Sequence, residues 1–98
     1  MMKKVATDKA PAAIGPYSQA VIFGGAVYTS GQIAIVPETG NIEATDVVGQ
    51  TEQVMKNLGE VLKAAGTSYD KAIKTTCFLA DIKDFAQFNE ANKSSLNA

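Results

Sequence analysis

Two short apolar segments near the N-terminus adjoin residues that could form a polar pocket. Gly15-Pro16 leads into Tyr17 at the start of the first segment, and Ser30 and Gly31 close the second one. Hydroxyl groups bordered by glycines could hydrogen-bond a small ligand there. The chain contains no His and no Arg, so the commonest proton shuttle and the usual bidentate clamp for a carboxylate are missing. Any function must therefore use other groups.

Each candidate residue also has a commoner structural interpretation. Tyr17 could lie at the edge of the core with a satisfied hydroxyl, Ser30 and Gly31 could simply end a strand, and Asn89 could be a polar residue on a helix surface. The lone Cys77 is predicted to be a small buried side chain and not a nucleophile, because no His is present to activate it. The acidic residues show no metal-site spacing and are interpreted as turn, cap and surface residues: Glu38, Glu43, Asp46 and Glu52.

Length and composition indicate one small globular domain. The 98 residues are 46% hydrophobic and 19% charged, and a chain of this size buries only about 60–65% of its unfolded surface, so oligomerisation would help it. The net charge is −1 and no Lys cluster is present for binding phosphate backbones. No apolar stretch is long enough for a membrane span. The N-terminus lacks an apolar signal core and there is a single Cys, so we expect a cytoplasmic protein without nucleic-acid or membrane partners.

Strands are predicted in the N-terminal part over residues 3–7, 17–23 and 26–30. The last two are expected to form a hairpin, because Gly24-Gly25 between them supplies the positive φ that a two-residue primed turn needs. A longer connection over residues 31–45 follows. It contains Pro37-Glu38-Thr39-Gly40, which is typical of a turn.

A helix is predicted from an Asp46 cap to about Ala65, with Gly66 as its left-handed C-terminal residue. Gly49 and Gly59 each weaken it by up to about 1 kcal/mol relative to Ala, although Gly59 could instead allow close packing on a sheet. Apolar residues recur at helical spacing and form one stripe: Val54, Leu58, Val61, Leu62 and Ala65.

A further strand is predicted over residues 72–80, which are rich in β-branched and aromatic side chains. A second helix is expected from Phe85, capped by Asp84, with Phe85 and Phe88 facing inward and a decaying pattern after Asn89. This order predicts an α+β fold in which two helices pack on one face of a sheet. Because a strand normally follows such a helix, we expect residues 1–98 to be a single domain that is C-terminally incomplete.

A series of short motifs runs in order through residues 5–90. They are Ala10-Pro11-Ala12-Ala13-Ile14-Gly15-Pro16-Tyr17-Ser18-Gln19-Ala20, Tyr28-Thr29-Ser30-Gly31-Gln32-Ile33, Pro37-Glu38-Thr39-Gly40, Gln50-Thr51-Glu52-Gln53, Asn57-Leu58, Ala64-Ala65-Gly66, Lys74-Thr75-Thr76 and Asp84-Phe85-Ala86. Through these motifs the chain resembles the Rid (YjgF/RidA) family of small enamine/imine deaminases, which were once described as translation inhibitors.

The resemblance implies a chorismate-mutase-like (YjgF-like) α+β fold and a homotrimer with clefts between its subunits. It also implies hydrolysis of 2-aminoacrylate, 2-iminobutanoate or 2-iminopropanoate to 2-keto acids and ammonia, without a cofactor or metal. Tyr17 matches the family's pocket tyrosine and Asn89 its pocket asparagine. Ser30 and Gly31 match a strand-end pair whose hydroxyl and backbone amide face the substrate. We therefore expect Tyr17, Ser30 and Asn89 to be catalytic and Gly31 to bind substrate.

Two further groups of the family have no counterpart in this chain. The family's arginine, which pairs with the substrate carboxylate, and its glutamate, which positions the water, would both follow residue 98, in the closing strands. A Lys point charge does not reproduce a bidentate guanidinium. Residues 1–98 alone are therefore expected to be inactive.

Three functions are compatible with these residues. The first is an enamine/imine deaminase, which the resemblance favours. The second is a non-catalytic, trimeric Rid homologue that binds small molecules or acts like a chaperone. The third is an endoribonuclease or translation inhibitor, against which the charge balance weighs because the chain has no basic surface for phosphates.

Overall fold

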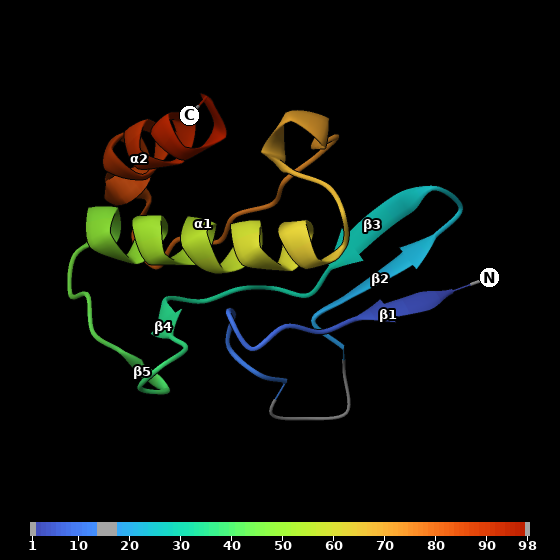
Figure 1. The fold of residues 1–98 in the computed structure, drawn as a ribbon. Coiled ribbons are helices and arrows are strands. Elements are labelled where there is room, and N and C mark those ends of the chain that lie inside the picture. Colours follow the sequence, from blue (N-terminus) through green and yellow to red (C-terminus); the bar gives the residue numbers. More distant parts are fainter. Residues whose placement is uncertain (1, 14–17, 98) are drawn as a thin grey trace.

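The N-terminal part of the chain forms a three-stranded antiparallel sheet. The computed structural model describes residues 2–13 and 18–97, so the predicted site residue Tyr17 lies outside the described residues. Strand β1 (Lys3–Val5) pairs with β2 (Ala20–Phe23), which also pairs with β3 (Ala26–Thr29). Figure 1 shows this sheet beside the long helix α1 (Val47–Ala64). The three strands confirm the predicted order, with shorter bounds than the sequence indicated.

The β2–β3 hairpin turns through the two glycines that the sequence singled out. Gly24 and Gly25 have φ values of 60° and 78°, and Phe23 stands opposite Ala26 in the register. Consecutive positive φ values define a primed turn, whose twist matches that of the flanking strands. The predicted hairpin is therefore confirmed.

A second, smaller hairpin lies in the connection between β3 and α1. Strands β4 (Ile35–Val36) and β5 (Asn41–Ile42) pair antiparallel around the predicted Pro37–Gly40 turn. The backbone amide of Gly40 donates to the carbonyl of Val36 at 2.8 Å, and Gly40 has a φ of 72°. The turn is confirmed, but two-residue strands carry too little periodicity to be predicted from the sequence.

Helix α1 begins and ends where the sequence predicted. The Asp46 side chain accepts from the amide of Gly49 at 3.3 Å. A Cβ on Gly49 would lie only 2.7 Å from that carboxylate oxygen, so this glycine makes room for the cap as well as weakening the helix. At the other end Gly66 has a φ of 85°, and Thr67 donates to the carbonyl of Leu62 at 2.9 Å. This pairing is the Schellman motif, which satisfies the last carbonyls of a helix.

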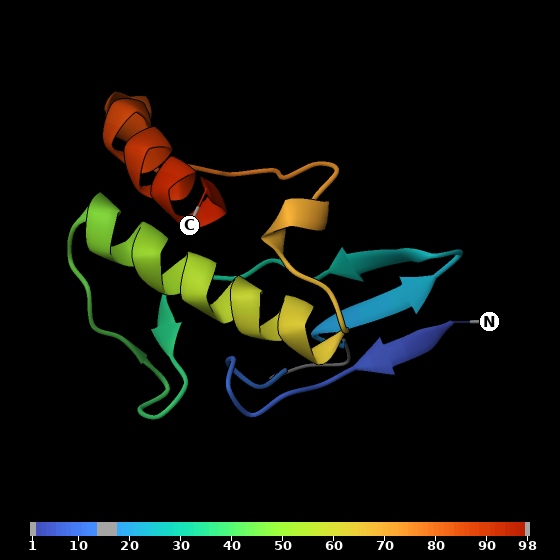
Figure 2. The same cartoon turned by 45° about the horizontal axis from the view of Figure 1, so that its top comes forward.

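The core lies between the sheet and α1. Val61 of α1 is fully buried against Val5 of β1 and Ala20 of β2, with Ala10 from the following loop. Figure 2 shows the C-terminal end of α1 beside the sheet, and two residues of the predicted apolar stripe, Val61 and Ala65, pack in this core cluster. The fold is α+β, as predicted.

No helix in residues 2–13 and 18–97 is both long and apolar enough to cross a membrane.

Tyr69 closes the C-terminal end of this packing. It begins the short helix η1 (Tyr69–Lys71), and its hydroxyl donates to the carbonyl of Met55 in α1. A Cβ on Gly59 would lie 3.2 Å from the Tyr69 ring. Gly59 therefore does allow close packing, but against this ring and not against a sheet. Burial raises the pKa of Tyr69 to about 12.

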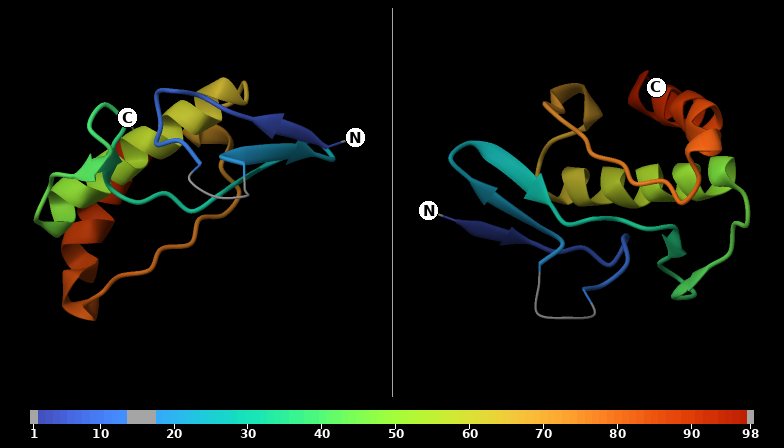
Figure 3. Two further views of the ribbon diagram at one scale, coloured as in Figure 1. Left: turned by 90° about the horizontal axis from the view of Figure 1, so that it is seen from below. Right: turned by 180° about the vertical axis from the view of Figure 1, so that it is seen from behind.

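Residues 72–80 do not form the predicted strand. They run from η1 toward the second helix without joining either sheet (Figure 3). Ile73 and Phe78 are each 92% exposed, and Cys77 is exposed as well, so the prediction that Cys77 is buried is wrong. A strand is stabilised by hydrogen bonds to a neighbour and by packing of one face. None of the described residues provides that neighbour.

The second helix starts at the predicted residue but is longer and less buried than expected. Helix α2 (Phe85–Asn97) follows the short helix η2 (Ile82–Asp84). The carboxylate of Asp81 caps η2, accepting from the backbone amide of Lys83 at 2.9 Å, whereas the Asp84 cap of α2 stays a prediction. Phe85 is 52% exposed and Phe88 is half-buried, because α2 packs mainly on α1 and its aromatic face is only partly covered.

Candidate functional site

The strand end after β3 joins two segments that are distant in the sequence. The amide of Ser30 donates to the carbonyl of Gln19 at 3.0 Å, and its hydroxyl donates to the carbonyl of Ser18. The Ser30 oxygen can still accept a hydrogen bond from a ligand, because a hydroxyl has two lone pairs. Gly31 is exposed, and no heavy atom lies within 4 Å of the position a Cβ would take. Ser30 and Gly31 thus border open space at a fixed strand end.

A buried glutamine holds the loop on the other side of this strand end. Gln19 is only 5% exposed, and its side-chain oxygen accepts from the amide of Thr7 at 2.6 Å. Its side-chain nitrogen donates to backbone carbonyls at 2.8 to 3.4 Å, those of Thr7, Ala10 and Pro11. The loop that leads toward the Gly15-Pro16-Tyr17 motif is therefore anchored to the start of β2.

A second buried amide holds the chain beyond Gly31. Asn57 of α1 is 0% exposed, and its nitrogen donates to the carbonyls of Ile33 and Ile35 at 3.1 and 2.8 Å. Its oxygen accepts from the side chain of Gln53 at 2.9 Å. The Asn57 carboxamide thus fixes the backbone that follows Gly31, whereas the Gln19 carboxamide fixes the loop before β2 and the main-chain carbonyl of Gln19 holds Ser30.

The structure does not bring Asn89 to this strand end. Asn89 is exposed on α2, and α2 lies over the N-terminal half of α1, whereas β3 ends beside the C-terminal half (Figures 1 and 2). Of the predicted site residues, Ser30 and Gly31 are therefore adjacent, and Asn89 lies apart from them. The position of Tyr17 stays a prediction.

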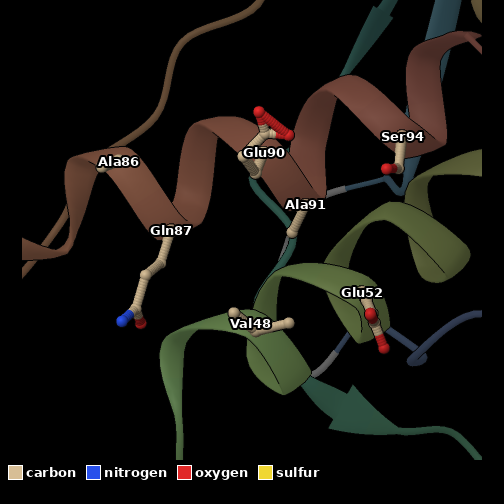
Figure 4. A pocket seen from close by; sticks show the side chains of 7 residues that line it. All are labelled: Val48, Glu52, Ala86, Gln87, Glu90, Ala91 and Ser94. Carbon is tan, nitrogen blue, oxygen red and sulfur yellow. The ribbon is translucent and has the colours of Figure 1, made fainter.

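An open groove of about 510 Å³ lies between α1 and α2, and none of the predicted site residues lines it. Its lining is Val48, Glu52, Ala86, Gln87, Glu90, Ala91 and Ser94. Figure 4 shows Glu90 pointing away from α1 while Glu52 lies on the opposite helix, so the two carboxylates do not converge. Nothing in this groove resembles a paired acid and base.

Cys77 is no better as a nucleophile in the structure than in the sequence. Partial desolvation raises the pKa of its thiol, which keeps the thiolate scarce at neutral pH. Because the chain has no His, no neighbouring base of that kind can activate it. The structure therefore contradicts the predicted burial of Cys77. The prediction that Cys77 is not a nucleophile is unchanged.

The two amides that hold the backbone near this strand end are not among the predicted site residues. Gln19 and Asn57 both fall within the quoted motifs, but their side chains were not singled out. Position 57 follows Val54 by three residues and precedes Val61 by four, so it belongs to the apolar face of the helix. A polar residue within such a stripe is the signal that could have revealed Asn57, because a buried amide must find partners.

The fold and the candidate site together define the class of this protein. It is a small α+β domain whose candidate site lies at a strand end next to a glycine. The endoribonuclease L-PSP (Ribonuc_L-PSP) family model matches residues 7–98, so the chain belongs to this family, which includes the YjgF and RidA proteins.

Relatives in this family carry deaminase names. Reactive Intermediate Deaminase A, chloroplastic, of Arabidopsis thaliana is 52% identical over 86 residues, which are 88% of this chain and 46% of that protein. The 2-iminobutanoate/2-iminopropanoate deaminase of Mus musculus is 49% identical over 92 residues, covering 94% of this chain and 68% of the relative. The chain thus spans about half of the first relative and about two thirds of the second.

A solved structure confirms the fold. The crystal structure of E. coli TdcF with bound serine matches with a TM-score of 0.92 and 44% identity, over 97% of this chain and 74% of that one.

Proposed function

We propose that this protein hydrolyses 2-aminoacrylate and small 2-imino acids, namely 2-iminobutanoate and 2-iminopropanoate, to 2-keto acids and ammonia without a cofactor. The observation that carries this proposal is about 50% identity, over nearly the whole chain, to relatives named for this reaction.

The chemistry needs little beyond positioning. The carbon of a C=N bond is already electrophilic, so one water adds to it, the nitrogen is protonated, and the C–N bond then breaks to release ammonia and leave the keto group. A site accelerates this sequence by orienting the water and the imine. In our proposal Gly31 and Ser30 hold the substrate at the strand end, and Tyr17 and Asn89 complete the pocket. Because a planar carboxylate is held best by a guanidinium, we also propose that full activity needs one in addition to residues 1–98.

A second copy of the chain is part of the proposal. Asn89 and Ser30 lie apart in one chain, so a pocket that contains both requires that they come from different subunits. A homotrimer with sites between its subunits would satisfy this requirement. Light scattering on the full-length protein is expected to give three times the chain mass, and a stable monomer at micromolar concentration would contradict the trimer.

The activity is tested by coupling the full-length protein to a threonine dehydratase, which generates 2-iminobutanoate. We expect release of keto acid and ammonia to be faster than without the protein. Ser30→Ala should lower the rate a few-fold to tenfold, since one positioning hydrogen bond is worth about 0.5–1.5 kcal/mol. No acceleration by the unmodified full-length protein would overturn the proposed function.

Binding without chemistry is the second candidate, because the TdcF relative was crystallised with bound serine. A protein of this kind would bind L-serine in a titration and leave the rate of imine hydrolysis unchanged.

We further propose a cytoplasmic location and no nucleic-acid or membrane partners. The net charge of −1 and the absence of a Lys cluster support the part of this proposal that concerns nucleic acid. Cell fractionation and an RNA-binding assay test these two points.

A further inference from the structure

We propose that Asn57 is a positioning residue that sets the backbone carrying Ser30 and Gly31, an inference that rests on the proposed function of that strand end. Asn57 is 0% exposed and lies on α1, whereas Ser30 and Gly31 follow β3. It would not touch the substrate. Its effect would pass through the polypeptide that it fixes.

The chain makes a tight turn directly after the candidate site. The amide of Ile35 donates to the carbonyl of Ile33 at 2.9 Å, which closes a turn centred on the buried Ala34. Asn57 donates to the carbonyl of Ile33 at 3.1 Å and to that of Ile35 at 2.8 Å. One carboxamide therefore fastens both ends of this turn to the helix.

The other side of the site is fastened as well. The amide of Ser30 donates to the carbonyl of Gln19 at 3.0 Å. Gly31 and Gln32 thus form a short bridge between one anchor at Ser30 and a second at Ile33. Because the bridge is two residues long, a shift of the second anchor must be absorbed by Gly31 or its neighbour.

Gln53 supports the orientation of the Asn57 carboxamide, which the carbonyls of Ile33 and Ile35 require because only its nitrogen can donate to them. The side-chain nitrogen of Gln53 donates to the Asn57 oxygen at 2.9 Å, and the Asn57 nitrogen is turned toward the two carbonyls. A flipped amide would present its oxygen to both carbonyls and its nitrogen to a donor. The hydrogen bond from Gln53 thus stabilises the arrangement of Asn57 that the two carbonyls require, as expected for residues that support a functional site from behind.

A purely structural role for Asn57 is the alternative, and Thr51 provides the control. Thr51 is also buried on α1, at 6% exposure, and its hydroxyl donates to the carbonyl of Val47 at 2.7 Å. This bond stays within the helix and does not reach residues 31–35. Thr51→Val therefore removes a buried hydrogen bond without disturbing the anchor.

The test compares Asn57→Leu, Gln53→Met and Thr51→Val in the full-length protein. Two readouts are taken: kcat/KM for 2-iminobutanoate, and the amide resonance of Gly31 in ¹⁵N NMR spectra without substrate. We expect Asn57→Leu to lower kcat/KM by about ten- to a hundredfold, the range for a misplacement on the order of 1 Å, and to move the Gly31 resonance. Gln53→Met should act in the same direction and more weakly. Thr51→Val should lower the melting temperature but leave both readouts near the unmodified values.

Two results would overturn the inference. One is a Gly31 resonance that stays in place in both Asn57→Leu and Gln53→Met. The other is an equal loss of kcat/KM in Thr51→Val. If the unmodified protein does not hydrolyse imines, the proposed function fails, and the Gly31 resonance still decides whether Asn57 sets the backbone. If Asn57→Leu does not fold, the same two readouts in Gln53→Met decide the question, because this is a milder change at a half-buried residue.

Discussion

Both halves of this molecule, the one before Gly66 and the one after it, contain sequence patterns typical of regular structure, but these patterns lead to different results. In the first, α1 and the β1–β3 sheet bury Val61 completely, and buried side-chain polar atoms in the described residues all have partners. In the second, residues 72–80 include four β-branched or aromatic residues, Ile73, Thr75, Thr76 and Phe78, but Ile73 and Phe78 are each 92% exposed. A suitable pattern becomes structure only where a partner surface is present.

The largest expected effect is a charge placed in the first half. Val61→Asp buries a carboxylate without a partner and should cost about 3–5 kcal/mol of folding free energy. The matched change in the second half, Phe78→Asp, should cost less than about 0.5 kcal/mol in a chain of residues 1–98, because that side chain is exposed. Urea denaturation measures both. An equal loss in the two variants would break the comparison and show that residues 72–80 are covered in solution.

The boundary between the halves is Gly66, and its conformation provides the next prediction. Gly66 has a φ of 85°, so Gly66→Ala should destabilise the protein by about 1–2 kcal/mol. Gly31→Ala is the control: Gly31 does not have a positive φ, and the position of its Cβ is open. A smaller change in unfolding free energy is expected there. Should Gly66→Ala prove neutral by thermal denaturation, the Schellman ending of α1 would be wrong.

The first and second halves are joined at Tyr69, whose titration can be followed directly. Burial raises its pKa to about 12 from an ordinary value of 10.0, so folding favours the neutral phenol. The stability this provides is complete below pH 10 and falls as pH rises from 10 toward 12. Tyr69→Phe should remove this alkaline decline, whereas Tyr28→Phe should not, since Tyr28 is 60% exposed. Urea midpoints at several alkaline pH values measure it, and a common curve for both variants would contradict the burial of Tyr69.

The smallest expected effect belongs to Cys77. Cys77→Ser should change the unfolding free energy by less than about 0.5 kcal/mol, because the side chain is exposed. In the native protein the thiol should react with an alkylating reagent without prior unfolding. If the thiol were protected under native conditions, residues 72–80 would be covered by a partner surface, as the strands of the first half are.

The sequence was sufficient where the determining interactions are local. The Gly24-Gly25 turn, the Asp46 cap and the Gly66 ending depend on φ values and nearby atoms, and all three are confirmed. The strand at 72–80 failed because pairing depends on a distant segment. In the candidate site, Ser30 and Gly31 are adjacent simply because they are consecutive in the sequence. The side chains of Gln19 and Asn57, in contrast, act through hydrogen bonds to residues 8 to 24 positions away. The periodic stripe marks Asn57 as a buried polar residue, but it does not indicate which distant carbonyls the side chain binds.

The anchors around the strand end are two neutral carboxamides, Gln19 and Asn57, and this choice affects how the protein would respond to its environment. Neither side chain gains or loses a proton between mild acid and mild alkali, and neither attracts mobile ions from the buffer. The shape of the strand end should accordingly stay constant across that range and across ionic strengths. A bell-shaped or sloping profile of rate against pH would then report the substrate and the groups that touch it, free of any contribution from a deforming framework.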